Sequence, residues 1–149
     1  MRLEDEISQK DFKTLEEKTF VNLLFTGKWI ESSSKKFLDQ FDVSPQQYNI
    51  LRILRGQYPE PCKVSLVGSR MLDKMSDVSR IIERMRVKKL VERNIKSTDR
   101  RSMDVVISKR GLGLLYKIDE ELHKMYSPFL RLTNEENLKL NDLLDKLRG

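Results

Sequence analysis

The hydrophobic pattern of this chain is most distinctive between residues 76 and 107, where its period changes. In the first half of this segment, apolar side chains recur three and four positions apart, as on one face of a helix. The period then falls to two on either side of a polar loop at residues 96–101. This change predicts a helix followed by a β-hairpin with a basic tip. The apolar positions of the helix are Val78, Ile81, Ile82 and Met85.

Helical patterns also precede this segment. Residues 1–10 are charged and aperiodic, and we expect them to be frayed. One long helix is predicted over residues 11–41, with apolar residues on more than one face. A second starts at Ser44–Pro45, because serine is a good N-cap and proline fits the first helical turn, and it ends near Gly56. A short third helix is predicted over residues 64–72.

The short helix and the helix from Ser76 are joined by a turn, which makes a helix-turn-helix. With the hairpin it forms a winged helix-turn-helix with a two-stranded β-wing, over about residues 44–107. Ser108 is the expected N-cap of another long helix, which Pro128 breaks, and Thr133 with Glu136 forms a capping box for a last helix. The predicted fold is a single, mainly α domain over residues 1–149. Long N- and C-terminal helices flank its winged helix, at about residues 11–41 and 109–147.

The charge of the chain is concentrated on the winged-helix segment. The 149 residues carry a formal net charge of +6, with 35% charged and 38% hydrophobic residues. Between Arg70 and Arg110 there are 13 Lys or Arg and six Asp or Glu, whereas the rest of the chain holds 16 basic and 17 acidic residues. The excess positive charge therefore lies on one segment, as expected for a surface that binds phosphates.

The composition excludes several classes of protein. A single cysteine, Cys62, allows no intramolecular disulfide and suits a reducing cytosol. No apolar run is long enough to span a membrane, and the N-terminal segment lacks the apolar core of a signal peptide, so we expect a soluble, cytoplasmic protein. His123 is the only histidine, and no nucleophile–base pair, Gly-rich phosphate loop or CxxC motif is present. We therefore expect neither an enzyme nor a bound metal or cofactor.

The order of long helix, helix-turn-helix, wing and two C-terminal helices resembles the MarR family of bacterial transcriptional regulators, over residues 12–147. The most specific likeness lies in residues 75–111, MSDVSRIIERMRVKKLVERNIKSTDRRSMDVVISKRG. There the recognition helix leads into a wing with an Asp-x-Arg motif, and a Ser-x-x-Gly opens the next helix. The matching positions are Met85, Leu90, Val91, Arg93, Asp99, Arg101, Ser108 and Gly111.

One position departs from the family pattern. Lys89 stands where the family usually has glycine, directly after the recognition helix. If the backbone keeps a positive φ there, lysine is strained by ~1 kcal/mol. A helix end of different shape is the alternative.

The resemblance implies a homodimer that binds double-stranded DNA at a pseudo-palindromic operator, as a repressor or less often an activator. In such proteins the first and last helices interleave between the two chains. The apolar residues here exceed what a small winged helix can cover, which also favours a two-fold dimer. The candidate dimerisation residues are Phe12, Leu15, Phe20, Leu138, Leu140, Leu143, Leu144 and Leu147.

The recognition helix and the wing supply the candidate DNA contacts. Arg80 and Arg84 are one helical turn apart, and arginine is suited to bidentate reading of guanine, although in an arbitrary helix such a pair is a solvated face. The resemblance implies that Asp99 orients Arg101 in a groove, where an ordinary turn is the alternative. Asp77 either caps the helix or accepts from a cytosine amino group. The candidate DNA-binding residues are Ser76, Asp77, Ser79, Arg80, Arg84, Arg93, Lys96, Arg100 and Arg101.

Family resemblance also implies release from DNA by a small aromatic or anionic ligand. Trp29, Tyr48 and Tyr116 are candidates to line such a pocket, and packing in the core is the alternative for all three. Cys62 has one basic neighbour in sequence, too little to predict a reactive thiolate, so we expect its role to be structural or incidental. Two other classes of function stay open: a winged helix that binds RNA or a protein through its basic face, and a small-molecule-binding protein that does not bind DNA.

Overall fold

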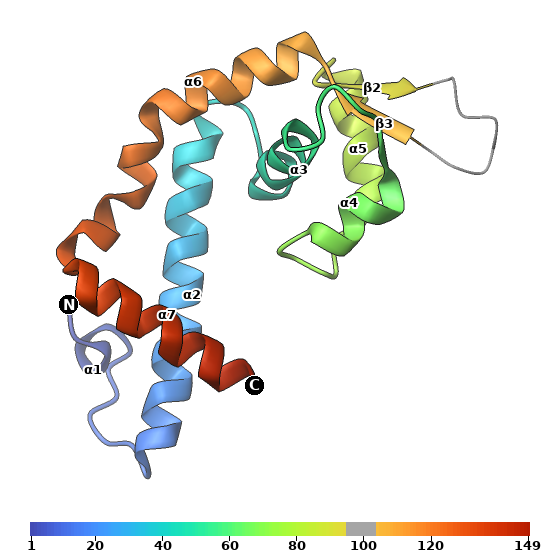
Figure 1. The fold of residues 1–149 in the computed structure, drawn as a ribbon. Helices are drawn as coiled ribbons and strands as arrows, with labels where there is room; N and C mark the ends of the chain where they lie inside the picture. Colours follow the sequence, from blue (N-terminus) through green and yellow to red (C-terminus); the bar gives the residue numbers. More distant parts are fainter. Residues whose placement is uncertain (95–103) are drawn as a thin grey trace. The chain divides into compact units, whose positions relative to one another are not determined.

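Helices make up most of the chain, as the apolar periodicity predicts (Figure 1). The computed structural model describes residues 1–94 and 104–149. It contains two compact units, residues 1–45 and residues 46–149. The mainly α winged-helix fold predicted from the sequence is confirmed, with one strand and one short helix that the sequence pattern did not predict.

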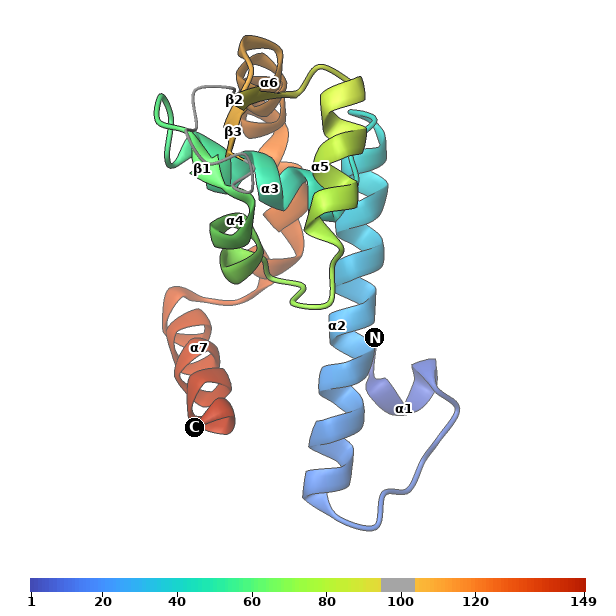
Figure 2. The same ribbon diagram turned by 90° about the vertical axis from the view of Figure 1, so that its right-hand side faces the viewer.

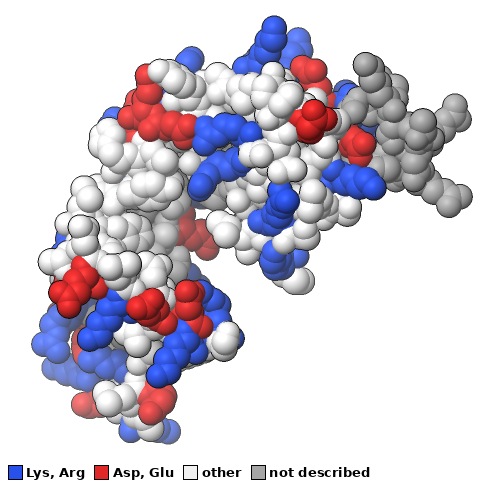
Figure 3. Space-filling model, viewed as in Figure 1, with Lys and Arg blue, Asp and Glu red and all other residues white. Residues whose placement is uncertain are grey.

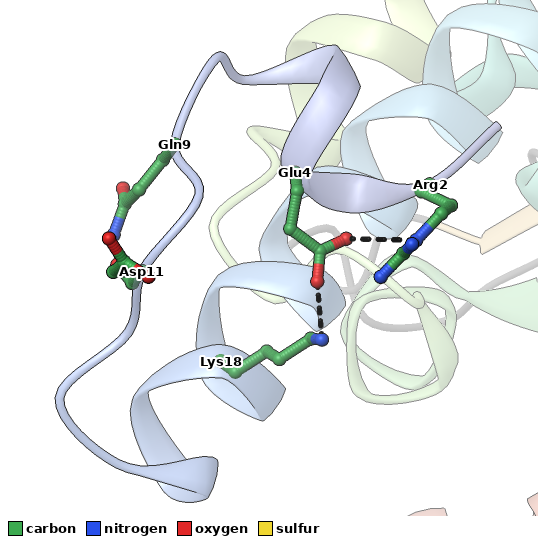
Figure 4. A network of polar contacts seen from close by, with 5 residues as sticks. All are labelled: Arg2, Glu4, Gln9, Asp11 and Lys18. Atoms are coloured by element: carbon green, nitrogen blue, oxygen red, sulfur yellow. Dashed lines mark hydrogen bonds and ion pairs between the residues drawn. The ribbon is translucent and has the colours of Figure 1, made fainter.

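The N-terminal segment of the first unit is held in place by an ionic network. A short helix, α1 (Leu3–Glu6), buries Leu3. The carboxylate of Glu4 accepts a hydrogen bond from the ammonium group of Lys18 and lies 3.7 Å from the guanidinium of Arg2 (Figure 4). The hydrogen bond from Lys18 lowers the pKa of Glu4. The expectation that all of residues 1–10 are frayed is therefore wrong for α1, whose charged side chains pair with the next helix.

Most of the first unit is the helix α2 (Leu15–Asp39), which is 25 residues long. Its N-cap, Thr14, accepts a hydrogen bond from the backbone N–H of Glu17 at 3.2 Å. The helix ends two residues before the predicted end, and the chain then turns through Asp42 at a φ of 54°. Among the side chains of α2, Phe37 and Leu38 are buried, whereas most of its other apolar side chains are partly or fully exposed.

The second unit contains the predicted helix-turn-helix. Helices α3 (Pro45–Arg55), α4 (Val64–Arg70) and α5 (Val78–Val87) begin close to the expected residues, and α4 ends two residues early. Each helix turns one apolar side inward, and Figure 2 shows α4 beside α5. The fully buried side chains of these helices are Ile50, Leu51, Leu54, Val67 and Met85, and Ile82 is nearly so. They form the core against which the recognition helix α5 is fixed.

The wing is part of a three-stranded antiparallel sheet. Strands β2 (Val91–Asn94) and β3 (Asp104–Ile107) pair as the predicted hairpin, with Val91 opposite Ile107. A third strand, β1 (Cys62–Lys63), pairs with the other edge of β3. The sequence did not predict β1, because two residues are too few to show an alternation and two prolines stand just before it. The hairpin tip at residues 95–103 lies outside the described residues.

After β3 the chain returns to helices. Helix α6 (Lys109–Tyr126) starts at the predicted N-cap, Ser108, and leads into a 3₁₀ helix, η1 (Ser127–Arg131), at the predicted proline break. Helix α7 (Asn134–Arg148) begins with the capping box predicted from Thr133 and Glu136, and both of its hydrogen bonds are present, at 2.8 and 3.2 Å.

The recognition helix ends in a Schellman motif. Lys89 has a φ of 59°, its N–H donates to the carbonyl of Arg86, and the N–H of Leu90 donates to the carbonyl of Met85, both at 2.9 Å. The side chains of Leu90 and Met85 are buried, as the hydrophobic contact of this motif requires. The turn that usually contains glycine is therefore kept with lysine, and a helix end of different shape is not found.

Replacing Lys89 by glycine should stabilise the protein. A side chain with a Cβ is strained in the left-handed region, whereas glycine is not, so we expect Lys89→Gly to raise the free energy of unfolding by about 0.5–1 kcal/mol. Lys89→Ala is the matched control, because it removes the charge but keeps the Cβ, and it should stay near wild type. Urea denaturation of the three proteins measures the difference. A glycine variant less stable than the alanine variant would contradict the strain.

Candidate nucleic-acid interface

Helix α5 has a buried side and an exposed side. Ile82 and Met85 are buried in the core, and the 3.6-residue period therefore leaves Arg80 and Arg84 on the solvent side. The carboxylate of Asp77 accepts a hydrogen bond from the backbone N–H of Arg80 at 3.1 Å, which makes Asp77 the N-cap of the helix. Of the two roles considered for Asp77, capping is thus the one seen in the fold.

The exposed arginines of α5 differ in their partners. The guanidinium of Arg86 binds both carboxylate oxygens of Glu83, at 2.7–3.1 Å, and this hydrogen bond lowers the pKa of Glu83. Arg80 and Arg84 have no ion-pair partner among residues 1–94 and 104–149. The acidic side chain of this face is therefore neutralised within the helix, and two guanidinium groups one turn apart remain available to a ligand.

The two candidate serines occupy different places. Ser76 lies in the turn before α5, where its hydroxyl donates to the carboxylate of Asp73 at 2.8 Å and lowers the pKa of Asp73. The prediction that the helix begins at Ser76 is therefore wrong by two residues, because α5 begins only at Val78. Ser79 lies in the first turn of α5 and is exposed. Ser79, Arg80 and Arg84 thus share the solvent side of the helix.

Further basic residues lie around the recognition helix. Arg93 is exposed in β2. The wing-tip candidates Lys96, Asp99, Arg100 and Arg101 lie outside the described residues. Figure 3 shows Lys and Arg side chains over the part of the surface formed by α3 to α5. Exposed residues next to and within α4 were not singled out by the sequence pattern, although the first helix of a helix-turn-helix crosses the DNA backbone; they are Lys63, Ser65, Ser69 and Arg70.

The candidate ligand-binding aromatics are not equivalent. Tyr48 is only 6% exposed, and its hydroxyl has no hydrogen-bond partner among the described residues. Burial raises the pKa of Tyr48, and the guanidinium of Arg52 lies 5.8 Å from its ring centre. Tyr116 is 67% exposed, and Trp29 belongs to the first unit. Tyr48 therefore fits the core alternative, with one polar atom left unpaired.

Polar residues of α3 and α6 meet near Tyr48. The guanidinium of Arg55 forms an ion pair with the carboxylate of Asp119. Asp119 and the hydroxyl of Tyr126 both act on the phenol of Tyr48, raising its pKa. Sequence reasoning did not find this group, because Arg55 and Asp119 are 64 positions apart and each appears in the sequence as an ordinary surface charge.

In the described part of the chain, we looked for a reactive cysteine, a metal site and a membrane-spanning helix as well. Cys62 is buried in β1, and burial raises the pKa of its thiol, which disfavours a reactive thiolate. No group of three or more His, Cys, Asp or Glu side chains suited to a metal ion occurs among the described residues. Within the same residues, no helix has the length and apolar character to cross a membrane.

Comparison with known proteins agrees with this fold. No family model matches the chain. MhqR of Bacillus subtilis (strain 168), an HTH-type transcriptional regulator, is 21% identical over 123 residues, which cover 83% of each chain. A MarR transcription factor from Planctomyces limnophilus is 28% identical, with a TM-score of 0.70 over 93% of this chain and 96% of its own.

Two other solved structures share the fold at lower identity. One is S. aureus MepR in complex with DNA, at 19% identity and a TM-score of 0.74 over 92% of this chain and 97% of its own. The other is the organohalide-sensing regulator RdhR in its 2,4-dichlorophenol-bound form, at 21% identity and a TM-score of 0.80 over 94% and 85%. The class of protein that the structure defines is the winged helix-turn-helix fold with an exposed basic face on α5. Within that class, the chain is similar in fold to solved MarR transcription regulators.

Removing the hydroxyl of Tyr48 should not destabilise the protein. A buried hydroxyl without a hydrogen-bond partner costs desolvation free energy of ~1–3 kcal/mol, so Tyr48→Phe should leave the free energy of unfolding unchanged or raise it. Tyr126→Phe, which removes a more exposed hydroxyl, is the matched control. Chemical denaturation is the measurement. A loss of more than about 1 kcal/mol in Tyr48→Phe alone would mean that the hydroxyl is bonded in solution.

Proposed function

We propose that this protein is a sequence-specific regulator of transcription that binds double-stranded DNA through α5. The observation that carries the proposal is the exposed pair Arg80 and Arg84, without ion-pair partners among the described residues, on a helix whose other side is fixed in the core. A helix of this diameter fits the major groove of B-DNA. MepR, which has the same fold, was solved in complex with DNA, which supports binding to DNA, and the relatives reported above are regulators rather than enzymes.

Each candidate residue receives a role from its position. Arg80 and Arg84 read guanine through two parallel hydrogen bonds, and Ser79 contacts a base edge or a phosphate. Asp77 fixes the helix start that presents them, and Ser76 holds the preceding turn.

The wing contacts the backbone and the groove that flank the site of α5. Arg93, Lys96 and Arg100 neutralise phosphates, and Asp99 orients Arg101 into the neighbouring minor groove. Binding at a pseudo-palindromic operator near a promoter then represses transcription, which takes place in the cytoplasm of a bacterial cell.

The role of the two arginines can be separated from their charge. On a duplex that the wild-type protein selects from a random pool, Arg80→Ala or Arg84→Ala should weaken binding by ~1–3 kcal/mol, with a much smaller loss on random duplex. Arg80→Lys and Arg84→Lys keep the charge but lose the bidentate geometry, and should behave like the alanine variants. Fluorescence anisotropy at fixed salt measures each affinity.

Lys124→Ala is the control, because it removes one positive charge from α6 and should change both affinities little. Lysine variants that bind like wild type would reassign the arginines to phosphate contacts. Variants with no loss at all would favour the alternative function, a winged helix that binds RNA or a protein through its basic face.

We propose further that the protein acts as a two-fold dimer built from both ends of the chain. In α7, Leu138 is 68% and Leu143 is 56% exposed, and in α2, Phe20 is 63% exposed. Single helices of this length are marginal in water without packing. Apolar surface on both terminal helices therefore favours burial against a second copy. The other proposed interface residues are Phe12, Leu15, Leu140, Leu144 and Leu147.

A carboxylate introduced into the middle of this apolar surface should disrupt the dimer. Wild-type protein at micromolar concentration should have the mass of two chains in light scattering. Leu143→Asp should shift the mass toward one chain, because it places a carboxylate in the buried interface. Asp142→Lys, a charge change on the side of the same helix opposite Leu140 and Leu144, should leave the dimer intact. A wild-type monomer that stays helical would contradict the proposal.

A small aromatic or anionic ligand is the proposed signal that releases DNA. RdhR was solved with 2,4-dichlorophenol, a phenolic compound, and it shares this fold. In this chain, the polar group around Tyr48, with Arg52, Arg55 and Asp119, offers both an aromatic ring and positive charge. Trp29 and Tyr116 remain candidates for the same role.

A further inference from the structure

The N-cap of α6 makes contacts beyond its own helix. The hydroxyl of Ser108 accepts a hydrogen bond from the N–H of Gly111 at 3.0 Å, as an N-cap does. The same hydroxyl donates to the carbonyl of Lys89 at 2.7 Å, and the N–H of Ser108 donates to the carbonyl of Leu90 at 3.1 Å. Ser108 is buried. It therefore binds the start of α6 and the two carbonyls that directly follow the recognition helix.

Close packing at Gly111 reinforces this contact. A Cβ on Gly111 would lie 2.3 Å from the carbonyl oxygen of Leu90 and 2.8 Å from the side chain of Ile107. A backbone carbonyl cannot move aside as a flexible side chain can, so only glycine allows the first turn of α6 to lie this close. We call Lys89, Leu90, Ser108 and Gly111 the junction.

We infer that Ser108 is a positioning residue that joins the recognition helix to α6, so that the orientation of α5 follows that of α6. Lys89 lies in the left-handed turn that ends α5, and its carbonyl and that of Leu90 are held on one side of the turn. The last turn of α5 therefore cannot rotate relative to α6 without breaking hydrogen bonds to Ser108.

The consequence of this inference for DNA binding rests on the proposed function. If α6 belongs to the dimer region, the distance between the two recognition helices of a dimer is set through the junction. That distance decides which spacing of half-sites a dimer can bind, because both recognition helices must enter the major groove on one side of the duplex. Ser108 then contributes to DNA specificity without contacting DNA.

The comparison with the other hydroxyl N-cap isolates the second role of Ser108. Thr133 caps α7 by accepting from Glu136, and its backbone N–H is bound by the same Glu136, so its capping contacts lie within its own helix. Ser108→Ala and Thr133→Ala thus both remove a cap hydroxyl. Only the first also releases the carbonyl of Lys89, in the turn that follows the recognition helix.

Amide hydrogen exchange of the full-length protein without DNA tests the junction. In Ser108→Ala, exchange should become roughly 2- to 10-fold faster at Gly111, whose N–H loses its acceptor, and also at Lys89 and Leu90, because the turn that contains these two N–H groups loses the hydrogen bond to the carbonyl of Lys89. In Thr133→Ala, the change should be confined to the first turn of α7. Ser108→Thr should restore slow exchange at both sites. Ser108→Gly, which is tolerated at an N-cap, gives the same comparison if the alanine variant folds poorly. An effect confined to α6 would overturn the inference.

A second measurement uses the duplex that wild-type protein selects from a random pool, and the same duplex with one base pair inserted between its half-sites. Wild type should prefer the original spacing, and Ser108→Ala should reduce that preference about 2- to 10-fold. Equal losses on both duplexes would mean that Ser108 affects stability alone, and would also overturn the inference. If wild type selects no duplex, the proposed function fails, while hydrogen exchange still decides whether the junction joins the two helices.

Discussion

Burial of Ile82 and Met85 in the core is the constraint on which the rest of the structure depends. With these two side chains buried, the helical period leaves Arg80 and Arg84 no position other than the solvent side. Asp77 fixes where the helix starts, and Glu83 holds Arg86 within the same turn. Packing therefore decides which groups a ligand can reach. Burial of one side of α5 in the core exposes the opposite side, and local hydrogen bonds leave the guanidinium groups of Arg80 and Arg84 available there.

Both ends of the recognition helix are held by hydrogen bonds to the main chain. At its start, a carboxylate caps the first turn, and at its end the Schellman motif turns the chain through Lys89 into the wing. Ser108 then connects that turn to α6. The end of the helix that carries the candidate DNA contacts is thus hydrogen-bonded, through one turn, to the start of α6, which suits a reading element whose contacts must fit base edges closely.

The sequence was sufficient for the features that depend on local periodicity and capping. The apolar face of α5, the β2–β3 hairpin, and the caps Ser108 and Thr133 follow from residue types at fixed spacing. Features that depend on tertiary contacts were not predictable: β1 becomes a strand only because β3 lies beside it, and the contact of Ser108 with Lys89 joins residues 19 positions apart. The positive φ of Lys89 was not predictable for the same reason, because it depends on how the chain packs after the helix, where Leu90 is buried.

The central claim is that α5 reads guanine bases in the major groove. Methylation interference tests it most directly, because methylation at N7 of guanine blocks the acceptor that arginine binds and leaves the phosphates unchanged. Wild-type protein should be mixed with a partly methylated duplex that it has itself selected from a random pool. The account predicts that methylation of particular guanines, placed symmetrically in two half-sites about one helical turn apart, abolishes binding. Binding that is indifferent to N7 methylation at every guanine would contradict it.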